Sequence, residues 1–291
     1  MSERSGGPTA GPSVGALLAD ATRRLAGAGL GEPRRAAVRI WADLAGAEPG
    51  GTFLQAREAV APETAERFVA AVERRAGGEP LPYVTGCAGF RRLTLRADRR
   101  ALIPRPETEG LVDVVLGVRR GGVVADIGTG SGCIALSLAT EGSYDEVLAL
   151  DCSAEALALA AENRELADAG RVRLVRSDLT QALAAASLDV LVSNPPYLTD
   201  GEYERLDDGV ARWEPREALA AGPDGLRHIT GLLHDGRRVL KPGGWLALEV
   251  DSARARTAAA LAHRLGWTSV QIVMDLFGRE RYLLARRSDS P

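Results

Sequence analysis

The amino-acid sequence predicts an α/β protein with a seven-stranded, mostly parallel sheet, preceded by a small N-terminal helical bundle and a linking β-hairpin. Before residue 80 the apolar residues recur at helical spacing, which predicts the bundle. From Gly122 onward short apolar runs alternate with helical segments, the pattern of a parallel sheet covered on both faces. Two closing strands with a short connection near Gly278 add one antiparallel strand. With 291 residues, 45% of them hydrophobic, the chain can form one large domain and a smaller one.

Changes in composition divide the chain into four segments. Residues 1–13 are rich in Ser, Gly and Pro and are therefore expected to form a disordered tail; because they lack an apolar stretch, they are not expected to be a signal peptide. Residues 14–80 form the predicted helical domain. Residues 81–107 are expected to be a β-hairpin linker, and residues 108–291 the larger α/β domain.

Local signals place the individual elements. Pro62 marks the start of one helix and Gly77 its end. In the linker, Ala97-Asp98 is the expected turn of the hairpin, and a helix is expected from about residue 108 to 116. Strands are expected at residues 123–126, 147–150, 172–175, 188–192, 245–250, 269–274 and 281–285.

Charge and composition exclude several classes of protein. A net charge of −3 and a pI of about 5.8 argue against a protein that coats nucleic acid. Three cysteines without a Cys-x-x-Cys pair suit a reduced, cytoplasmic compartment, and three histidines without ligand spacing predict no metal. Because no run of 18 apolar residues occurs, no membrane span is expected. The residues concerned are Cys87, Cys133, Cys152, His228, His234 and His263.

A glycine-rich segment follows the first predicted strand and leads into a helix. Glycines let the backbone turn tightly and approach a ligand closely. The dinucleotide-binding pattern requires a glycine where Cys133 stands, so a nicotinamide site is not favoured. The spacing resembles instead the first motif of the S-adenosylmethionine methyltransferases; the alternative is a tight turn that binds nothing. The expected cofactor ligands here are Asp126, Gly128, Thr129, Gly130, Ser131 and Gly132.

Acidic residues end the next two predicted strands. Asp151 is placed to accept hydrogen bonds from two ribose hydroxyls, or else to cap the helix that begins at Ser153. Asp178 is expected to accept from an adenine amino group, with Leu179 against the ring. The alternative for Asp178 is an ordinary loop acid at a helix start.

The tetrapeptide Asn194-Pro195-Pro196-Tyr197 follows the fourth predicted strand. Two consecutive prolines cannot extend a sheet and fix a rigid loop. The Asn194 side-chain oxygen and the Pro195 carbonyl can each accept one N–H of a target –NH₂, which turns a poorly nucleophilic nitrogen toward a methyl donor. Tyr197 supplies a wall for a planar group. These residues are the candidate catalytic and substrate-binding set, with Asn194 also near the cofactor. The same device suits an adenine or cytosine amino group or a glutamine amide.

The substrate is suggested by a resemblance to the release-factor glutamine methyltransferases of the HemK/PrmC type. The resemblance covers about residues 80–286, and more loosely the helices before them. It rests on the motifs above and on Pro82-Tyr83-Val84-Thr85-Gly86 with Phe90, Leu102-Ile103-Pro104-Arg105-Pro106-Glu107-Thr108-Glu109, Glu214-Pro215, Ala218-Leu219, Asp224-Gly225-Leu226, Gly243-Gly244, Glu249 and Gly278-Arg279. Three positions depart from it: Val250-Asp251 replaces a common His-Gly, and Leu179 replaces a common aromatic residue.

The resemblance implies a Rossmann-like class I methyltransferase that uses S-adenosylmethionine. It would methylate the side-chain amide nitrogen of the glutamine in the Gly-Gly-Gln motif of peptide chain release factors, with the N-terminal domain binding that substrate. A monomer without direct nucleic-acid binding is expected. Two alternatives stay open, an N-methyltransferase for a small metabolite and one for a nucleic-acid amino group. The sequence assigns no role to Glu107 or Glu109.

Overall fold

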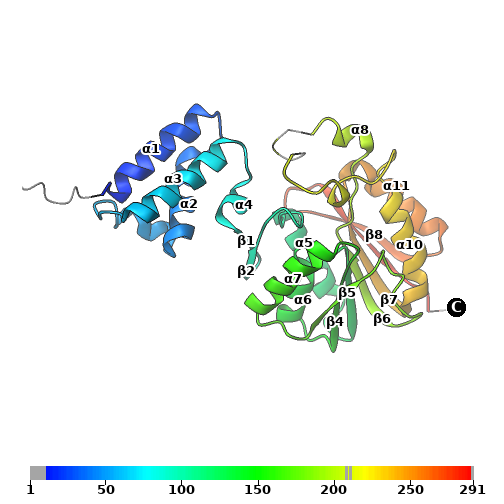
Figure 1. Ribbon diagram of the computed structural model, residues 1–291. Coiled ribbons are helices and arrows are strands. Elements are labelled where there is room, and N and C mark those ends of the chain that lie inside the picture. Colours follow the sequence, from blue (N-terminus) through cyan, green and yellow to red (C-terminus); the bar gives the residue numbers. More distant parts are fainter. Residues whose placement is uncertain (1–10, 207–208, 210–211, 290–291) are drawn as a thin grey trace, which may run out of the picture. The chain divides into compact units, whose positions relative to one another are not determined.

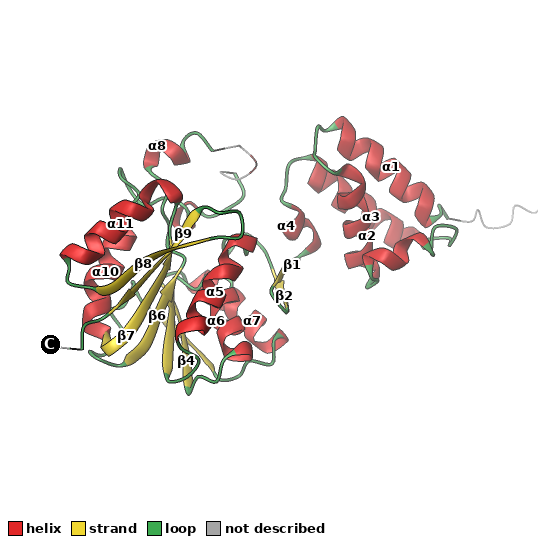
Figure 2. Cartoon of the chain, turned by 180° about the vertical axis from the view of Figure 1, so that it is seen from behind, coloured by secondary structure: helices red, strands yellow, loops and turns green. Residues whose placement is uncertain are grey.

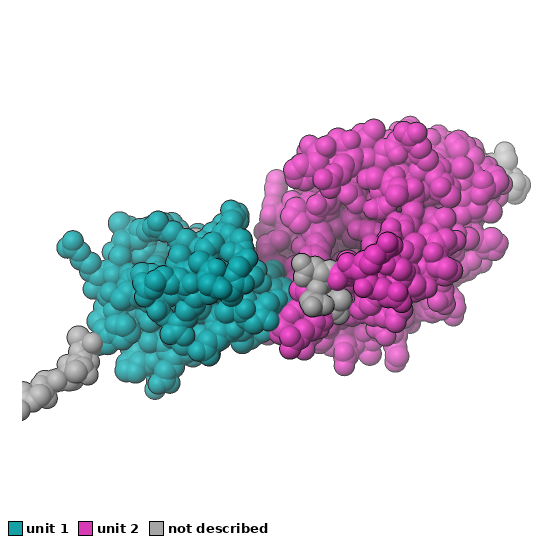
Figure 3. Space-filling model, turned by 90° about the horizontal axis from the view of Figure 1, so that it is seen from above, with its two compact units in different colours: residues 1–86 teal, residues 87–291 magenta. Residues whose placement is uncertain are grey.

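Amphipathic helices build the first of two compact units, residues 1–86 and 87–291 (Figure 3). The structure, a computed structural model, describes residues 11–206, 209 and 212–289. Of the expected tail, residues 1–10 lie outside the described residues, whereas Ser13 caps the first helix. The elements of this unit are α1 (Val14–Gly27), α2 (Pro33–Ala45), the 3-10 turn η1 (Pro49–Phe53), α3 (Pro62–Ala76) and α4 (Leu81–Thr85).

The core of the first unit lies between α1, α2 and α3. Leu25, Ile40 and Phe68 are fully buried there, and the ring of Trp41 meets the edge of Phe68 at 5.6 Å between ring centroids. Helix α3 begins at Pro62 because proline fits the first helical position, where no N–H is needed. The predicted start and end of this helix are therefore correct.

A short hairpin, β1 (Cys87–Phe90) and β2 (Leu93–Arg96), begins the second unit. The expected turn at Ala97-Asp98 is wrong, because the chain turns at Arg91-Arg92. Arg91 has a left-handed backbone (φ 52°), which arginine rarely adopts. Tertiary contacts hold it there: its N–H donates to Glu109, and its guanidinium donates to Glu141 at 2.7 and 2.8 Å. Local turn propensity could not reveal these distant partners.

The sheet of the second unit has the order β5-β4-β3-β6-β7-β9-β8, and only β9 runs antiparallel to its neighbours (Figures 1 and 2). This confirms the predicted seven-stranded, mostly parallel sheet with one antiparallel strand. Its strands are β3 (Val123–Ile127), β4 (Glu146–Asp151), β5 (Val172–Arg176), β6 (Leu188–Ser193), β7 (Leu240–Glu249), β8 (Thr268–Met274) and β9 (Glu280–Arg286).

Helices cover both faces of this sheet (Figure 2). One buried cluster packs α5 and α6 on one face, and a second packs α10 and α11 on the other. Neighbouring residues of one strand alternate between them: Val124 belongs to the first cluster, Ala125 to the second. The helical elements are α5 (Pro106–Val118), α6 (Cys133–Glu141), α7 (Ala154–Leu166), α8 (Asp200–Tyr203), the 3-10 turn η2 (Arg216–Ala218), α10 (Arg227–Val239) and α11 (Ser252–Arg264).

The carboxyl ends of the parallel strands form one edge of the sheet, on the side of α8 in Figure 1. Loops that follow parallel strands at this edge are the usual ligand sites of open α/β sheets. Because β9 is antiparallel, its first residues, rather than its last, lie at the same edge. The loops after β3, β4 and β6 and the turn before β9 are thereby brought to one side of the unit.

Candidate active site

The glycine-rich loop between β3 and α6 is tied to the neighbouring strand by its backbone. The N–H groups of Gly128 and Thr129 both donate to the Leu150 carbonyl at 2.8 Å. Gly128 (φ 71°) and Gly132 (φ 85°) adopt left-handed backbones that favour glycine. A Cβ placed on Gly128 would meet no protein atom within 4 Å, so the space beside this residue is open to a ligand.

Asp126, at the end of β3, lies beneath this loop and is fully buried. Its Oδ2 accepts from the Thr129 hydroxyl at 2.6 Å and from the Ala135 N–H at 3.2 Å. Its Oδ1 has no hydrogen-bond partner. Burial raises the pKa of Asp126 to about 7, because a charged carboxylate is poorly stabilised away from water.

The Asp151 carboxylate joins the glycine loop to the start of α7. Its Oδ2 accepts from the Gly130 N–H and its Oδ1 from the Ser153 N–H, both at 2.9 Å. The side chain that caps α7 is that of Ser153, which accepts from the Ala156 N–H. Since a carboxylate oxygen accepts two hydrogen bonds, each oxygen of Asp151 retains capacity for a hydroxyl.

Asp178, the third acidic residue expected at the cofactor site, is more exposed than Asp126 and Asp151. Asp178 is exposed and accepts a weak bond from the Gln181 amide at 3.3 Å. It borders an open hollow at the ends of β4 and β5. Leu179 packs against the core cluster beneath α10, so its side chain is partly buried. The hollow is lined by Cys152, Arg176, Ser177, Asp178, Gln181 and Ala182.

The Asn-Pro-Pro-Tyr loop follows β6 and is anchored to the segment that precedes the glycine loop. Ser193, the last residue of β6, donates its hydroxyl to the Ile127 carbonyl at 2.6 Å. The Asn194 side-chain amide donates to the Thr108 hydroxyl at 3.0 Å. This orientation leaves the Asn194 Oδ1 as the acceptor available to a ligand. Pro195 is buried, and burial raises the pKa of Tyr197 to about 12, so the phenol stays neutral.

Glu249, at the end of β7, contacts Thr108, the residue to which Asn194 donates. Its carboxylate is hydrogen-bonded by Thr108, so Thr108 stands between Glu249 and Asn194. Glu249 is only 2% exposed and its Oε2 has no hydrogen-bond partner. Burial raises its pKa to about 7 despite the lowering effect of the Thr108 bond. No role for Thr108 could be predicted from the sequence, because Thr108 and Asn194 are 86 positions apart and meet only in the fold.

The segment that contains Glu107 and Glu109 contacts the hairpin turn, strand β9 and the long loop after β6. Glu109 binds the hairpin turn through the Arg91 N–H, and the Glu107 carbonyl accepts from the Tyr282 hydroxyl of β9. Arg105 donates to both oxygens of the buried Glu214 at 2.8 and 2.6 Å, which joins this segment to the long loop after β6. Glu109 is therefore an anchor of the hairpin.

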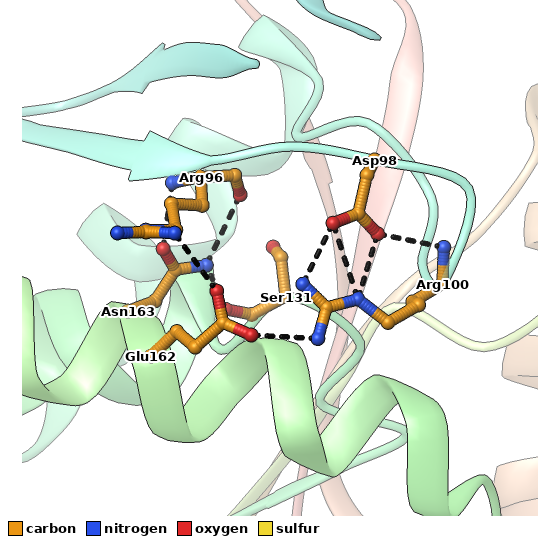
Figure 4. Close-up of polar contacts among 6 residues, drawn as sticks. All are labelled: Arg96, Asp98, Arg100, Ser131, Glu162 and Asn163. Carbon is orange, nitrogen blue, oxygen red and sulfur yellow. Dashed lines mark hydrogen bonds and ion pairs between the residues drawn. The ribbon is translucent and has the colours of Figure 1, made fainter.

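A buried asparagine of α7 links the hairpin to the glycine loop (Figure 4). The Asn163 Oδ1 accepts from the Arg96 N–H at 2.6 Å, and its amide donates to the carbonyls of Arg96 and Ser131. Arg100, which also binds Asp98, forms an ion pair with the adjacent Glu162 at 2.7 Å. Sequence reasoning missed Asn163; a polar residue among the alanines and leucines of a buried helix face was the available signal.

Two families of sequences match this chain. The family described as "PrmC N-terminal domain" matches residues 16–86, and that described as "Methyltransferase small domain" matches residues 108–207. The release factor glutamine methyltransferase of Cereibacter sphaeroides is 39% identical over 92% of this chain and 96% of its own length. That of Moorella thermoacetica is 40% identical over 94% of this chain and 98% of its own.

Solved structures share the fold at lower identity. A methyltransferase from Pyrococcus furiosus superposes with a TM-score of 0.52 and 24% identity, covering 67% of this chain and 89% of that one. The catalytic domain of hMettl16, solved with an RNA hairpin, gives a TM-score of 0.53 at 16% identity, covering 79% and 83%. These likenesses concern the fold alone.

None of the helices in the described ranges is both long and apolar enough to span a membrane.

Proposed function

Because this chain belongs to the family of release factor glutamine methyltransferases, we propose that it transfers a methyl group from S-adenosylmethionine to a glutamine side chain of peptide chain release factors. The target is the amide nitrogen of the glutamine in their Gly-Gly-Gln motif. The enzyme is expected to act as a cytoplasmic monomer.

The orientation of the Asn194 side chain carries the proposal. An amide nitrogen is a poor nucleophile because its lone pair is delocalised into the carbonyl. Asn194 donates to Thr108 and therefore presents an oxygen, not an NH₂ group, to a substrate. With the Pro195 carbonyl it would hold both N–H bonds of the target amide, which directs the nitrogen lone pair and favours its tetrahedral geometry. Pro196 stiffens this loop, and Tyr197 would flank the planar group.

Three features of the loops after β3 and β4 support the fit of S-adenosylmethionine. The left-handed glycines leave open space beside Gly128, the carboxylate of Asp151 retains acceptor capacity, and the buried Asp126 has an unpartnered oxygen. Asp151 would hold the ribose hydroxyls, and Asp178 with Leu179 would flank the adenine. Thr129, Gly130, Ser131 and Gly132 complete the loop, and Asn194 would lie near the methyl group. When bound, the cofactor supplies an electrophilic methyl group on a sulfonium.

The proton of the target nitrogen needs no strong base in this scheme. Methyl transfer leaves that nitrogen positively charged and strongly acidic, so the proton departs to water or to a neighbouring oxygen. Asn194 and Pro195 would keep the two hydrogens in place until then. Tyr197 is a poor acceptor of this proton, because its phenol stays neutral at the raised pKa of about 12.

The first unit would bind the release factor. We assign this role to residues 14–80, followed by the linker over 81–107 and the methyltransferase domain over 108–291. Its exposed Phe53 and Leu54 are apolar residues that a partner could cover. A substrate-binding role for the first unit favours a protein substrate over a small metabolite, because a small metabolite would not need a separate helical unit for its binding.

The test is methylation with isotopically labelled S-adenosylmethionine. An intact bacterial release factor, free glutamine and an adenine-containing DNA duplex would be incubated in parallel with the full-length protein. We expect label in the release factor, and mass analysis should show that the Gly-Gly-Gln peptide has exchanged one hydrogen for one methyl group. Labelled DNA with an unlabelled release factor would reject the protein substrate. Label in free glutamine as fast as in the release factor would reject the role given to residues 14–80.

A further inference from the structure

The turn between β8 and β9 exposes a cluster of large apolar side chains. Leu276 is 99% exposed, Phe277 72% and Met274 54%. In the described part of the second unit, Leu166 is the only other large hydrophobic side chain with comparable exposure. Single exposed apolar residues are common on protein surfaces, but three within four positions form a patch that favours contact with another macromolecule.

This turn is built to hold its shape. The Asp275 carboxylate is nearly buried, and its Oδ1 accepts from the N–H groups of Phe277 and Arg279, both at 2.9 Å. The Asp275 N–H donates to the Arg279 carbonyl, and the Gly278 N–H to the Asp275 carbonyl. The apolar side chains therefore stand on a turn with little freedom to fold back onto the sheet, and a fixed turn loses little entropy when a partner binds.

The same turn lies beside the candidate methyl-acceptor site. Strand β9 pairs with β7 through Glu249 and Tyr282, so the residues just before β9 project from the same sheet edge at which Asn194 follows β6. Only β7 separates β9 from β6 in the sheet. Arg281 lies between the turn and the candidate acceptor site. It binds Asp275 of the turn, and its positive charge lowers the pKa of Tyr197 and of Glu249.

We propose that Met274, Leu276 and Phe277 form a docking surface for the release factor, covering an apolar part of its surface next to the Gly-Gly-Gln loop. This inference rests on the proposed function and adds a contact from the second unit. A glutamine that reaches Asn194 belongs to a folded protein, whose neighbouring surface must lie against this sheet edge. A small metabolite or free glutamine would not extend from Asn194 across β7 to the turn.

The experiment compares the double variant Leu276→Ser/Phe277→Ser with the wild-type protein on an intact release factor. Leu166→Ser is the matched control, because Leu166 is a similarly exposed leucine at the end of α7, away from the acceptor edge. Initial rates give KM for the release factor and kcat, and calorimetry gives the affinity for S-adenosylmethionine. Thermal melting checks the fold.

We expect the KM of the double variant for the release factor to rise roughly ten-fold or more, as loss of central apolar contacts does at protein interfaces. Its kcat at saturating release factor, cofactor affinity and melting temperature should stay within about two-fold or a few degrees of the wild type. An unchanged KM, or an equal rise with Leu166→Ser, overturns the docking surface and leaves the proposed function standing. A wild-type protein that methylates no release factor overturns both.

Discussion

The Asn194 side-chain amide lies 3.0 Å from the Thr108 hydroxyl, so the acceptor loop after β6 is held by the first turn of α5. Thr108 is itself bonded to Glu249 and is buried. When Glu249 is ionised its carboxylate only accepts, so the Thr108 hydroxyl donates to Glu249 while the Thr108 oxygen accepts from Asn194. The orientation of the Asn194 amide is thus set by groups from β6, β7 and α5.

Replacement of Asn194 tests the proposed acceptor directly. Asn194→Ala should lower kcat by about two orders of magnitude or more, since the target amide would lose one of two positioning acceptors. Asn194→Asp keeps an acceptor but adds a negative charge beside the sulfonium, so cofactor binding should be retained or tighter while turnover falls. Single-turnover rates and calorimetry separate these effects. An Asn194→Ala protein that turns over at the wild-type rate would remove Asn194 from the mechanism.

Thr108 is predicted to be a positioning residue. In Thr108→Val the hydroxyl is lost at nearly constant volume, so the Asn194 amide is free to rotate and present its NH₂ group to the substrate. We expect kcat to fall roughly ten- to a hundred-fold, with cofactor affinity unchanged. Thr108→Ser restores the hydroxyl and should recover most of the rate. If Val and Ser variants lose activity equally, packing at this position, not the hydrogen bond, is what matters.

Asp151 is predicted to hold the ribose. Asp151→Ala should weaken S-adenosylmethionine binding roughly ten- to a hundred-fold, because a charge-assisted hydrogen bond contributes about 1.5–3 kcal/mol. The variant also loses the bonds to Gly130 and Ser153, so a second analogue is needed. A 2′-deoxyribose analogue of the cofactor should bind the wild type more weakly, yet bind Asp151→Ala as well as the parent cofactor does. Equal binding of both compounds by the wild type would leave Asp151 a structural residue.

Asn163 is predicted to stabilise the second unit and to support the cofactor loop. Asn163→Ala leaves one N–H and two carbonyls without their side-chain partner, which should cost about 2–4 kcal/mol of unfolding free energy. Denaturant unfolding measures this. Because Ser131 belongs to the glycine loop, cofactor affinity should fall too. Thr22→Ala, which removes a hydroxyl on α1 of the first unit, is a control that should leave cofactor affinity unchanged.

Burial of Glu249 predicts a pH-dependent stability. Its pKa is about 7 in the folded protein against 4.5 for an ordinary glutamate, so the folded state holds the proton more tightly. Its contribution to the unfolding free energy is therefore greatest below pH 4.5 and falls as the pH rises to about 7, by on the order of 3 kcal/mol. Glu249→Gln removes this titrating group and should make the pH profile less steep in this window, where the buried Asp126 continues to titrate. Parallel profiles for both proteins would contradict the raised pKa.

The strands were predicted closely because their apolar runs are interrupted by glycines and polar loops at regular intervals. The closing strand expected at 281–285, for example, is β9 over Glu280–Arg286. The hairpin turn was misplaced because a left-handed Arg91 is stabilised by Glu109 and Glu141, which lie far along the chain. Motif residues of the candidate site were visible in the sequence. The roles of their supports, Thr108 and Asn163, could not be predicted, because the partners of both side chains lie on distant segments of the chain.

The position of β9 between β7 and β8 has a consequence for biosynthesis. Strand β8 leaves the ribosome before β9, yet in the described sheet it pairs with β9 alone. Until β9 follows, β8 is a single strand without a partner and β7 is an open edge, a state in which unrelated chains could add to the sheet. The helical first unit, complete by residue 86, has no such dependence and can fold during translation. Nascent chains stalled between β8 and β9 should therefore be the ones that chaperones retain.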